Sequence, residues 1–76
     1  MIKRELETLG WNVDVYIPSE DNMAFLRAYK NDYELKWWEV GNCLEIYDDA
    51  GDCCFCGYIE DEKDLIVLER LLKINS

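Results

Sequence analysis

The chain has 76 residues, with 17 acidic and 8 basic side chains and no histidine, which gives a formal net charge of −9. This length fits a single domain, residues 1–76, with a small core. A hydrophobic fraction of 50% and an aromatic fraction of 13% indicate a chain that folds. The acidic balance excludes direct binding of the DNA or RNA backbone, which needs a basic surface. The absence of histidine removes the commonest general base and metal ligand.

The beginning of the chain and its cysteines bear on the compartment. Residues 1–7 carry two bases but no apolar run of signal-peptide length. No stretch approaches the roughly 18 apolar residues of a membrane span. Four cysteines in a chain without a targeting signal are typical of reduced thiols. We therefore expect a soluble cytoplasmic protein that does not contact a membrane.

The first segment predicts a short helix followed by a strand. Apolar residues recur at helical spacing over residues 2–9, and Gly10 follows where a left-handed helix end is common. Residues 11–17 alternate between apolar and polar side chains and predict a half-buried strand that ends at Pro18. The expected apolar face of this strand consists of Trp11, Val13, Val15 and Ile17.

Residues 23–30 are compatible with two structures. As a helix, the segment would start from Ser19 as N-cap. As a strand, it would lead through a tight turn at residues 31–32 into the aromatic-rich strand of residues 33–40. We favour the strand because Asn and Asp are typical turn residues.

The remainder predicts two more strands and a helix. Gly41-Asn42 predicts a two-residue hairpin turn into a strand over residues 43–48, and a second turn leads into a strand over residues 53–59. The final helix begins within residues 60–64, where Asp61 can cap the free amides. Its expected apolar stripe contains Leu65, Leu68 and Leu72, with Ile66 or Leu71 beside them, and continues to Ile74.

These elements predict an α+β domain. It has a short N-terminal helix, an antiparallel meander of four to five strands, and a C-terminal helix packed on the sheet.

The cysteines allow a metal or redox interpretation. Cys53 and Cys56 form a C-x-x-C pair, with Cys54 between them and Cys43 on the preceding strand. A zinc site normally takes four convergent ligands, and a redox pair usually lies at a helix N-terminus. On a regular strand Cys53 and Cys56 point to opposite faces, whereas Cys54 and Cys56 share one. We therefore predict packing roles, with no metal and no cofactor. A small cysteine-ligated metal or redox protein remains the second alternative.

Most of the charge imbalance lies in residues 45–64, where eight acids face Lys63 alone, a net charge of −7. Apart from Glu45 they form two groups. The first acidic group is Asp48, Asp49 and Asp52, and the second is Glu60, Asp61, Glu62 and Asp64. The predicted topology places these groups at opposite ends of one strand, about 20 Å apart. Charges so separated resemble a spread of phosphates more than one metal cage. No catalytic partner accompanies them, so we expect no enzyme activity.

The aromatic residues supply candidate anchors for a partner. Trp37 and Trp38 are adjacent, so one must face inward and the other outward on a strand. Tyr47 and Tyr58 are expected as a stacked pair on neighbouring strands. Because Trp and Tyr are enriched in binding hot spots, we expect Trp38, Tyr47 or Tyr58 to provide the apolar contact.

In its size, acidity, aromatic content and lack of recognisable chemistry, the chain resembles the small acidic inhibitors encoded by phages and mobile elements. These include anti-CRISPR proteins and DNA-mimic anti-restriction proteins. The resemblance implies a non-enzymatic inhibitor that blocks a basic nucleic-acid-binding groove of a host defence nuclease or CRISPR-type complex. The partner is then a protein with a basic nucleic-acid-binding surface. The chain is also similar in size and charge to immunity proteins that neutralise nuclease toxins, which is the first alternative.

Overall fold

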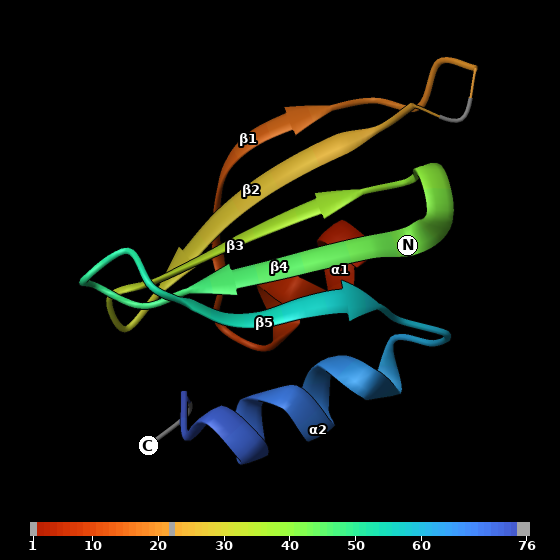
Figure 1. Ribbon diagram of the computed structural model, residues 1–76. Coiled ribbons are helices and arrows are strands. Elements are labelled where there is room, and N and C mark those ends of the chain that lie inside the picture. The colour runs from red at the N-terminus through yellow and green to blue at the C-terminus, as the bar shows by residue number, and fades with distance from the viewer. Residues whose placement is uncertain (1, 22, 75–76) are drawn as a thin grey trace.

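The computed structural model describes residues 2–21 and 23–74, which form a five-stranded antiparallel sheet and two helices (Figure 1). The elements are α1 (Ile2–Thr8), β1 (Asn12–Ile17), β2 (Phe25–Lys30), β3 (Tyr33–Trp38), a short 3-10 helix (Val40–Asn42), β4 (Cys43–Tyr47), β5 (Cys53–Tyr58) and α2 (Lys63–Leu72). The strands lie side by side in chain order, as a meander. The predicted α+β fold is therefore confirmed.

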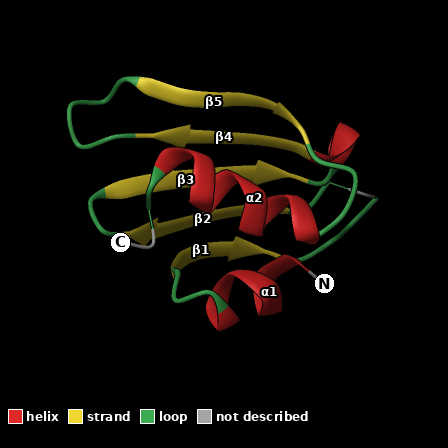
Figure 2. Cartoon of the chain, turned by 90° about the horizontal axis from the view of Figure 1, so that it is seen from below, coloured by secondary structure: helices red, strands yellow, loops and turns green. Residues whose placement is uncertain are grey.

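Both helices pack against the same face of the sheet, termed here the inner face (Figure 2). Its side chains contribute six of the fourteen buried core residues: Leu26, Ala28, Leu35, Trp37, Leu44 and Ile46. The helices add Ile2, Leu6, Leu65 and Leu68 to this core. The opposite face, termed the outer face, carries neither of the two helices (Figures 1 and 2). Among the described residues, the helices therefore cover only one side of the sheet.

The strand β1 departs from the strict alternation expected for it. Its register shifts between Val13 and Val15, so Val13 lies opposite the inner-face Ala28 and Val15 lies opposite the outer-face Arg27. The expected single apolar face of Trp11, Val13, Val15 and Ile17 is therefore wrong. The bulge turns Tyr16 toward the core instead, opposite Leu26. Sequence periodicity cannot reveal an inserted residue of this kind.

The segment that could have been a helix is the strand β2, and the tight turn after it is confirmed. Asn31 and Asp32 both adopt positive φ angles, 48° and 69°. The next connection is longer than the expected two-residue turn, because β3 ends at Trp38 and the chain needs residues 39–42 to return. Asn42 explains this loop: its Oδ1 accepts the indole N–H of Trp37 at 2.7 Å and its Nδ2 donates to the carbonyl of Ile59 at 2.6 Å.

Local backbone geometry and hydrogen bonds mark the end of α1 and both ends of α2. Gly10 has φ +96° beyond α1, as expected for a left-handed helix end. The carboxylate of Asp61 accepts the N–H of Lys63 at 2.7 Å, which confirms its capping role. Beyond α2, Lys73 has φ 58° and the N–H of Ile74 donates to the carbonyl of Glu69 at 2.9 Å, so Ile74 turns back into the core.

The apolar stripe of α2 is narrower than expected. Leu65 and Leu68 are buried, whereas Ile66 and Leu71 are exposed to solvent. The helix is fixed instead by a buried ion pair between Glu69 and Lys30 of β2. The ammonium of Lys30 also donates to the carbonyl of Leu9, just beyond α1. One side chain therefore holds both helices on the inner face.

Candidate partner-binding surface

The first acidic group occupies the turn between β4 and β5. Asp48 has a structural role there, because its Oδ1 accepts the N–H of Ala50 at 3.0 Å and that of Asp52 at 2.9 Å. Asp49 and Asp52 are exposed, and within the described part of the chain their carboxylates have no hydrogen bond or ion pair. The turn therefore separates one carboxylate that shapes it from two that are available to a partner.

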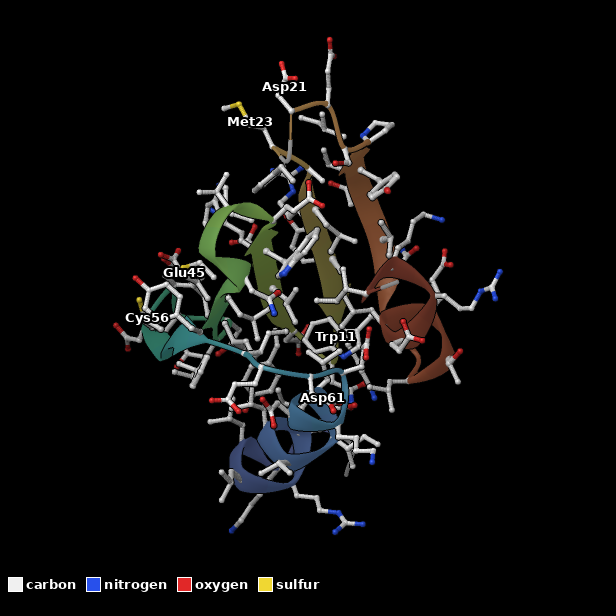
Figure 3. All side chains as sticks on the ribbon, turned by 90° about the vertical axis from the view of Figure 1, so that its right-hand side faces the viewer. Trp11, Asp21, Met23, Glu45, Cys56 and Asp61 are labelled. Atoms are coloured by element: carbon white, nitrogen blue, oxygen red, sulfur yellow. The ribbon has the colours of Figure 1, made fainter. Side chains whose placement is uncertain are left out.

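The second acidic group lies between β5 and α2, and two of its members accept backbone hydrogen bonds. Asp61 caps the helix start, and the Oδ2 of Asp64 accepts the N–H of Glu60 at 2.9 Å. The side chains of Glu60 and Glu62 are exposed. Figure 3 shows Asp61 at the beginning of α2. Two of the four acids therefore build the loop, and Glu60 and Glu62 extend its charge into solvent.

The two groups lie at opposite ends of β5, whose six residues span about 20 Å (Figure 1). Two further acids, which the sequence reasoning left out, adjoin the first group. Asp32 and Glu34 line a shallow hollow on the outer face together with Asp48 and Asp49. The sequence could have indicated both residues. Alternate turns of a meander lie at the same end of the sheet, so the β2–β3 turn must approach the β4–β5 turn.

The three basic residues of the sheet are neutralised by ion pairs. Arg27 on the outer face contacts Asp14 at 2.5 Å, and Lys36 lies 4.0 Å from Glu34. Lys30 is paired with Glu69 below the sheet. The other five bases lie on the helices or at their ends: Lys3, Arg4, Lys63, Arg70 and Lys73. The acidic ends of β5 therefore face solvent without a compensating base from the sheet.

The paired tryptophans point to opposite faces, as expected. Trp37 is buried on the inner face, and Trp38 is half-buried on the outer face with its ring 5.4 Å from that of Phe25. Tyr58 lies in the same cross-strand row and is 76% exposed. Trp38 and Tyr58 thus form an accessible aromatic strip near the second acidic group.

Tyr47 and Tyr58 do not stack, contrary to expectation. The register places Tyr58 opposite Cys43 and Tyr47 opposite Cys53, at the two ends of the β4–β5 pair. This separation is about 13 Å along the strand. The hydroxyl of Tyr47 instead donates to Glu45 at 2.5 Å. That hydrogen bond raises the pKa of Tyr47 to about 12, because ionisation would place a second negative charge beside the carboxylate.

The faces predicted for the cysteines are also wrong. A bulge at the start of β5 places Cys53 opposite Tyr47, while Cys56 lies opposite Glu45, so Cys53 and Cys56 share the outer face. Figure 3 shows Glu45 and Cys56 side by side, and Cys56 Sγ is 3.9 Å from Glu45 Oε2. Desolvation, and then the Glu45 charge, raises the pKa of the Cys56 thiol. A raised pKa is the opposite of what an activated thiolate needs.

Burial likewise raises the pKa of the Cys54 thiol, with a further contribution from Asp48. All four cysteines are free thiols. Among residues 2–21 and 23–74, no three side chains of the metal-binding types converge on a metal site. The same residues contain no helix long and apolar enough to cross a membrane.

A comparison of the chain with protein-family models, curated proteins and solved structures finds no match in any of the three.

Proposed function

We propose that this protein is a non-enzymatic inhibitor that occupies a basic nucleic-acid-binding groove on another protein. The observation that carries the proposal is the pair of acidic groups at the two ends of β5, with exposed carboxylates at Asp49, Asp52, Glu60 and Glu62. Along the axis of a DNA duplex the phosphates of one strand recur about every 3.4 Å, so a span of about 20 Å along that axis corresponds to roughly six of them. The acidic ends of the strand are suited to a groove of similar extent.

The outer face supplies the apolar part of the contact. Trp38 and Tyr58 lie beside the second acidic group, and the exposed Val40 follows in the adjoining loop. Tyr47 contributes its ring to the hollow beside the first group. Aromatic side chains surrounded by charge are typical of interface hot spots, where the ring provides affinity and the charges provide orientation.

The mechanism is exclusion of DNA or RNA from the groove. Acidic carboxylates accelerate the encounter with Lys and Arg side chains, and this acceleration weakens as salt screens the charges. The bound inhibitor then blocks the nucleic acid sterically. Its target is a host defence nuclease or CRISPR-type complex, and the setting is the cytoplasm. The raised thiol pKa of Cys54 and Cys56 supports this reading over the redox alternative.

The test starts from affinity capture of the tagged protein from bacterial lysate, followed by competition with DNA and RNA. A nucleic-acid-processing complex released by the competitor is the expected result. A secreted nuclease toxin as the captured partner would establish the immunity-protein alternative. Release that is insensitive to both salt and nucleic acid would contradict the mimic mechanism.

A charge-reversal pair then locates the surface. The double variant Asp49→Lys with Asp52→Lys spares Asp48, which holds the turn. It should weaken capture by about two orders of magnitude, since each close charge pair contributes about 1.5 kcal/mol or more, and 1.4 kcal/mol is a factor of ten. The matched control, Glu7→Lys with Glu20→Lys, changes the net charge equally at exposed positions away from β5. Equal losses in both variants would show that only net charge matters.

A further inference from the structure

The strand β5 is an edge of the sheet that no described element covers (Figure 2). Its sequence, Cys-Cys-Phe-Cys-Gly-Tyr, contains no charge and no proline. The opposite edge strand β1 is protected differently: it contains Asp14 within a bulge and is followed by Pro18. Natural proteins use such devices to prevent strand pairing at an open edge. The absence of charge and proline on β5 marks this edge as available for pairing.

The backbone of β5 has hydrogen-bonding groups directed outward. The N–H of Ile59 donates to the carbonyl of Asn42 at 3.1 Å, which shows that the backbone of Ile59 bonds toward the β4 side. The backbone N–H and C=O groups of successive residues point to alternate sides of a strand, so those of Phe55 and Gly57 bond toward β4. The N–H and C=O groups of Cys56 and Tyr58 therefore point toward the open edge. The bulge is confined to the first residues of the strand and leaves this part regular.

A shallow apolar hollow of about 170 Å³ lies next to this edge, between β5 and α2. Its lining consists of Phe55, Tyr58, Ile59, Asp64, Val67 and Leu68. Val67 is 52% exposed although it is aliphatic. A strand added beside β5 directs alternate side chains toward the inner face, over this hollow. The hollow therefore provides a place for one apolar side chain of an added strand.

The charges at the two ends of β5 determine what kind of strand fits. A second copy pairing antiparallel through β5 would bring Asp52 of each chain next to Glu60 of the other, and both chains carry a net charge of −9. Like charges in such positions oppose self-pairing. A segment with Lys or Arg at both ends finds an acidic group at each end of the edge instead.

We propose that the β5 edge binds an extended segment of a partner protein as a sixth strand, with an apolar centre flanked by basic residues. Main-chain hydrogen bonds to Cys56 and Tyr58 supply affinity, and the hollow beside Val67 and the two acidic groups supply specificity. A peptide alone can test this binding to the β5 edge, so the outcome is independent of nucleic-acid mimicry.

The probe is a fluorescent nine-residue peptide with the centre Thr-Val-Thr-Val-Thr and two lysines at each end. Fluorescence anisotropy should show saturable binding, and a peptide with glutamates in place of the lysines should bind at least about tenfold more weakly. On binding, amide hydrogen exchange at Cys56 and Tyr58 should slow. Equal binding of the two peptides, or unchanged exchange at both amides, would overturn the proposal.

Two substitutions at one position separate the backbone from the side chain. Cys56→Pro removes an outward N–H without breaking the ladder to β4 and should weaken lysine-peptide binding about tenfold. Cys56→Ser keeps that N–H and should bind like the unaltered protein. Val67→Gln, on an exposed helix position, tests the hollow without altering the edge and should reduce affinity severalfold. Undiminished binding by the proline and glutamine variants, or dimerisation of the unaltered protein through β5, would contradict the proposal.

Discussion

The two faces of the sheet differ in how their side chains are used. Inner-face residues such as Leu35 and Leu44 are buried under the helices and have apolar neighbours on all sides. On the outer face, Arg27 pairs with Asp14 of the neighbouring strand, and Tyr47 donates a hydrogen bond to Glu45 on its own strand. Both helices lie on the inner face, and no described helix covers the outer face. Stability and binding should therefore respond to different substitutions.

The largest expected effect is the difference in stability between two truncations on β4, one on each face. Leu44→Ala removes a fully buried side chain and should lower the free energy of unfolding by about 3 kcal/mol. The adjacent Cys43→Ala, on the outer face, should cost less than about 1 kcal/mol. Urea unfolding followed by tryptophan fluorescence measures both. Similar losses in the two variants would remove the distinction between the faces.

A smaller effect separates neighbouring acids within one turn. Asp48→Ala removes two side-chain hydrogen bonds to backbone amides and should destabilise the fold by about 1 kcal/mol. Asp49→Ala, one residue along, should leave thermal unfolding unchanged while weakening capture of the partner. The comparison fails if both variants unfold at the same lowered temperature.

The smallest effect is a titration on the outer face. Tyr47 should ionise near pH 12, and Glu45→Gln should bring its pKa back toward 10, as measured by phenolate absorbance. Because the folded-state pKa lies above the unfolded value, the stabilisation is fully present below pH 10 and is lost as the pH rises toward 12. An unchanged titration in Glu45→Gln would show that the carboxylate is not the cause.

Much of the fold could be predicted from local signals. The turn residues Asn31 and Asp32 located a hairpin, and Asp61 located the start of a helix, because each acts through its own backbone geometry. The bulges in β1 and β5 could not be predicted, since an inserted residue changes the face of every later side chain without changing the sequence pattern. The faces of Ile17 and Cys53 were wrong for this reason.

The candidate site was predictable in position but not in the roles of its members. Charge density alone identified residues 45–64, yet it could not separate Asp48, which holds a turn, from the exposed Asp49. Nor could it show that Glu45 is engaged by Tyr47. Such roles depend on hydrogen-bond partners that only the folded chain brings together.

The Lys30 ammonium has a consequence for the way in which the domain unfolds. A seven-residue helix such as α1 is too short to persist alone in water. Because Lys30 binds both the carbonyl of Leu9 and the carboxylate of Glu69, opening either helix leaves a buried charge short of a partner. We therefore expect the two helices to open together with the sheet as one cooperative unit.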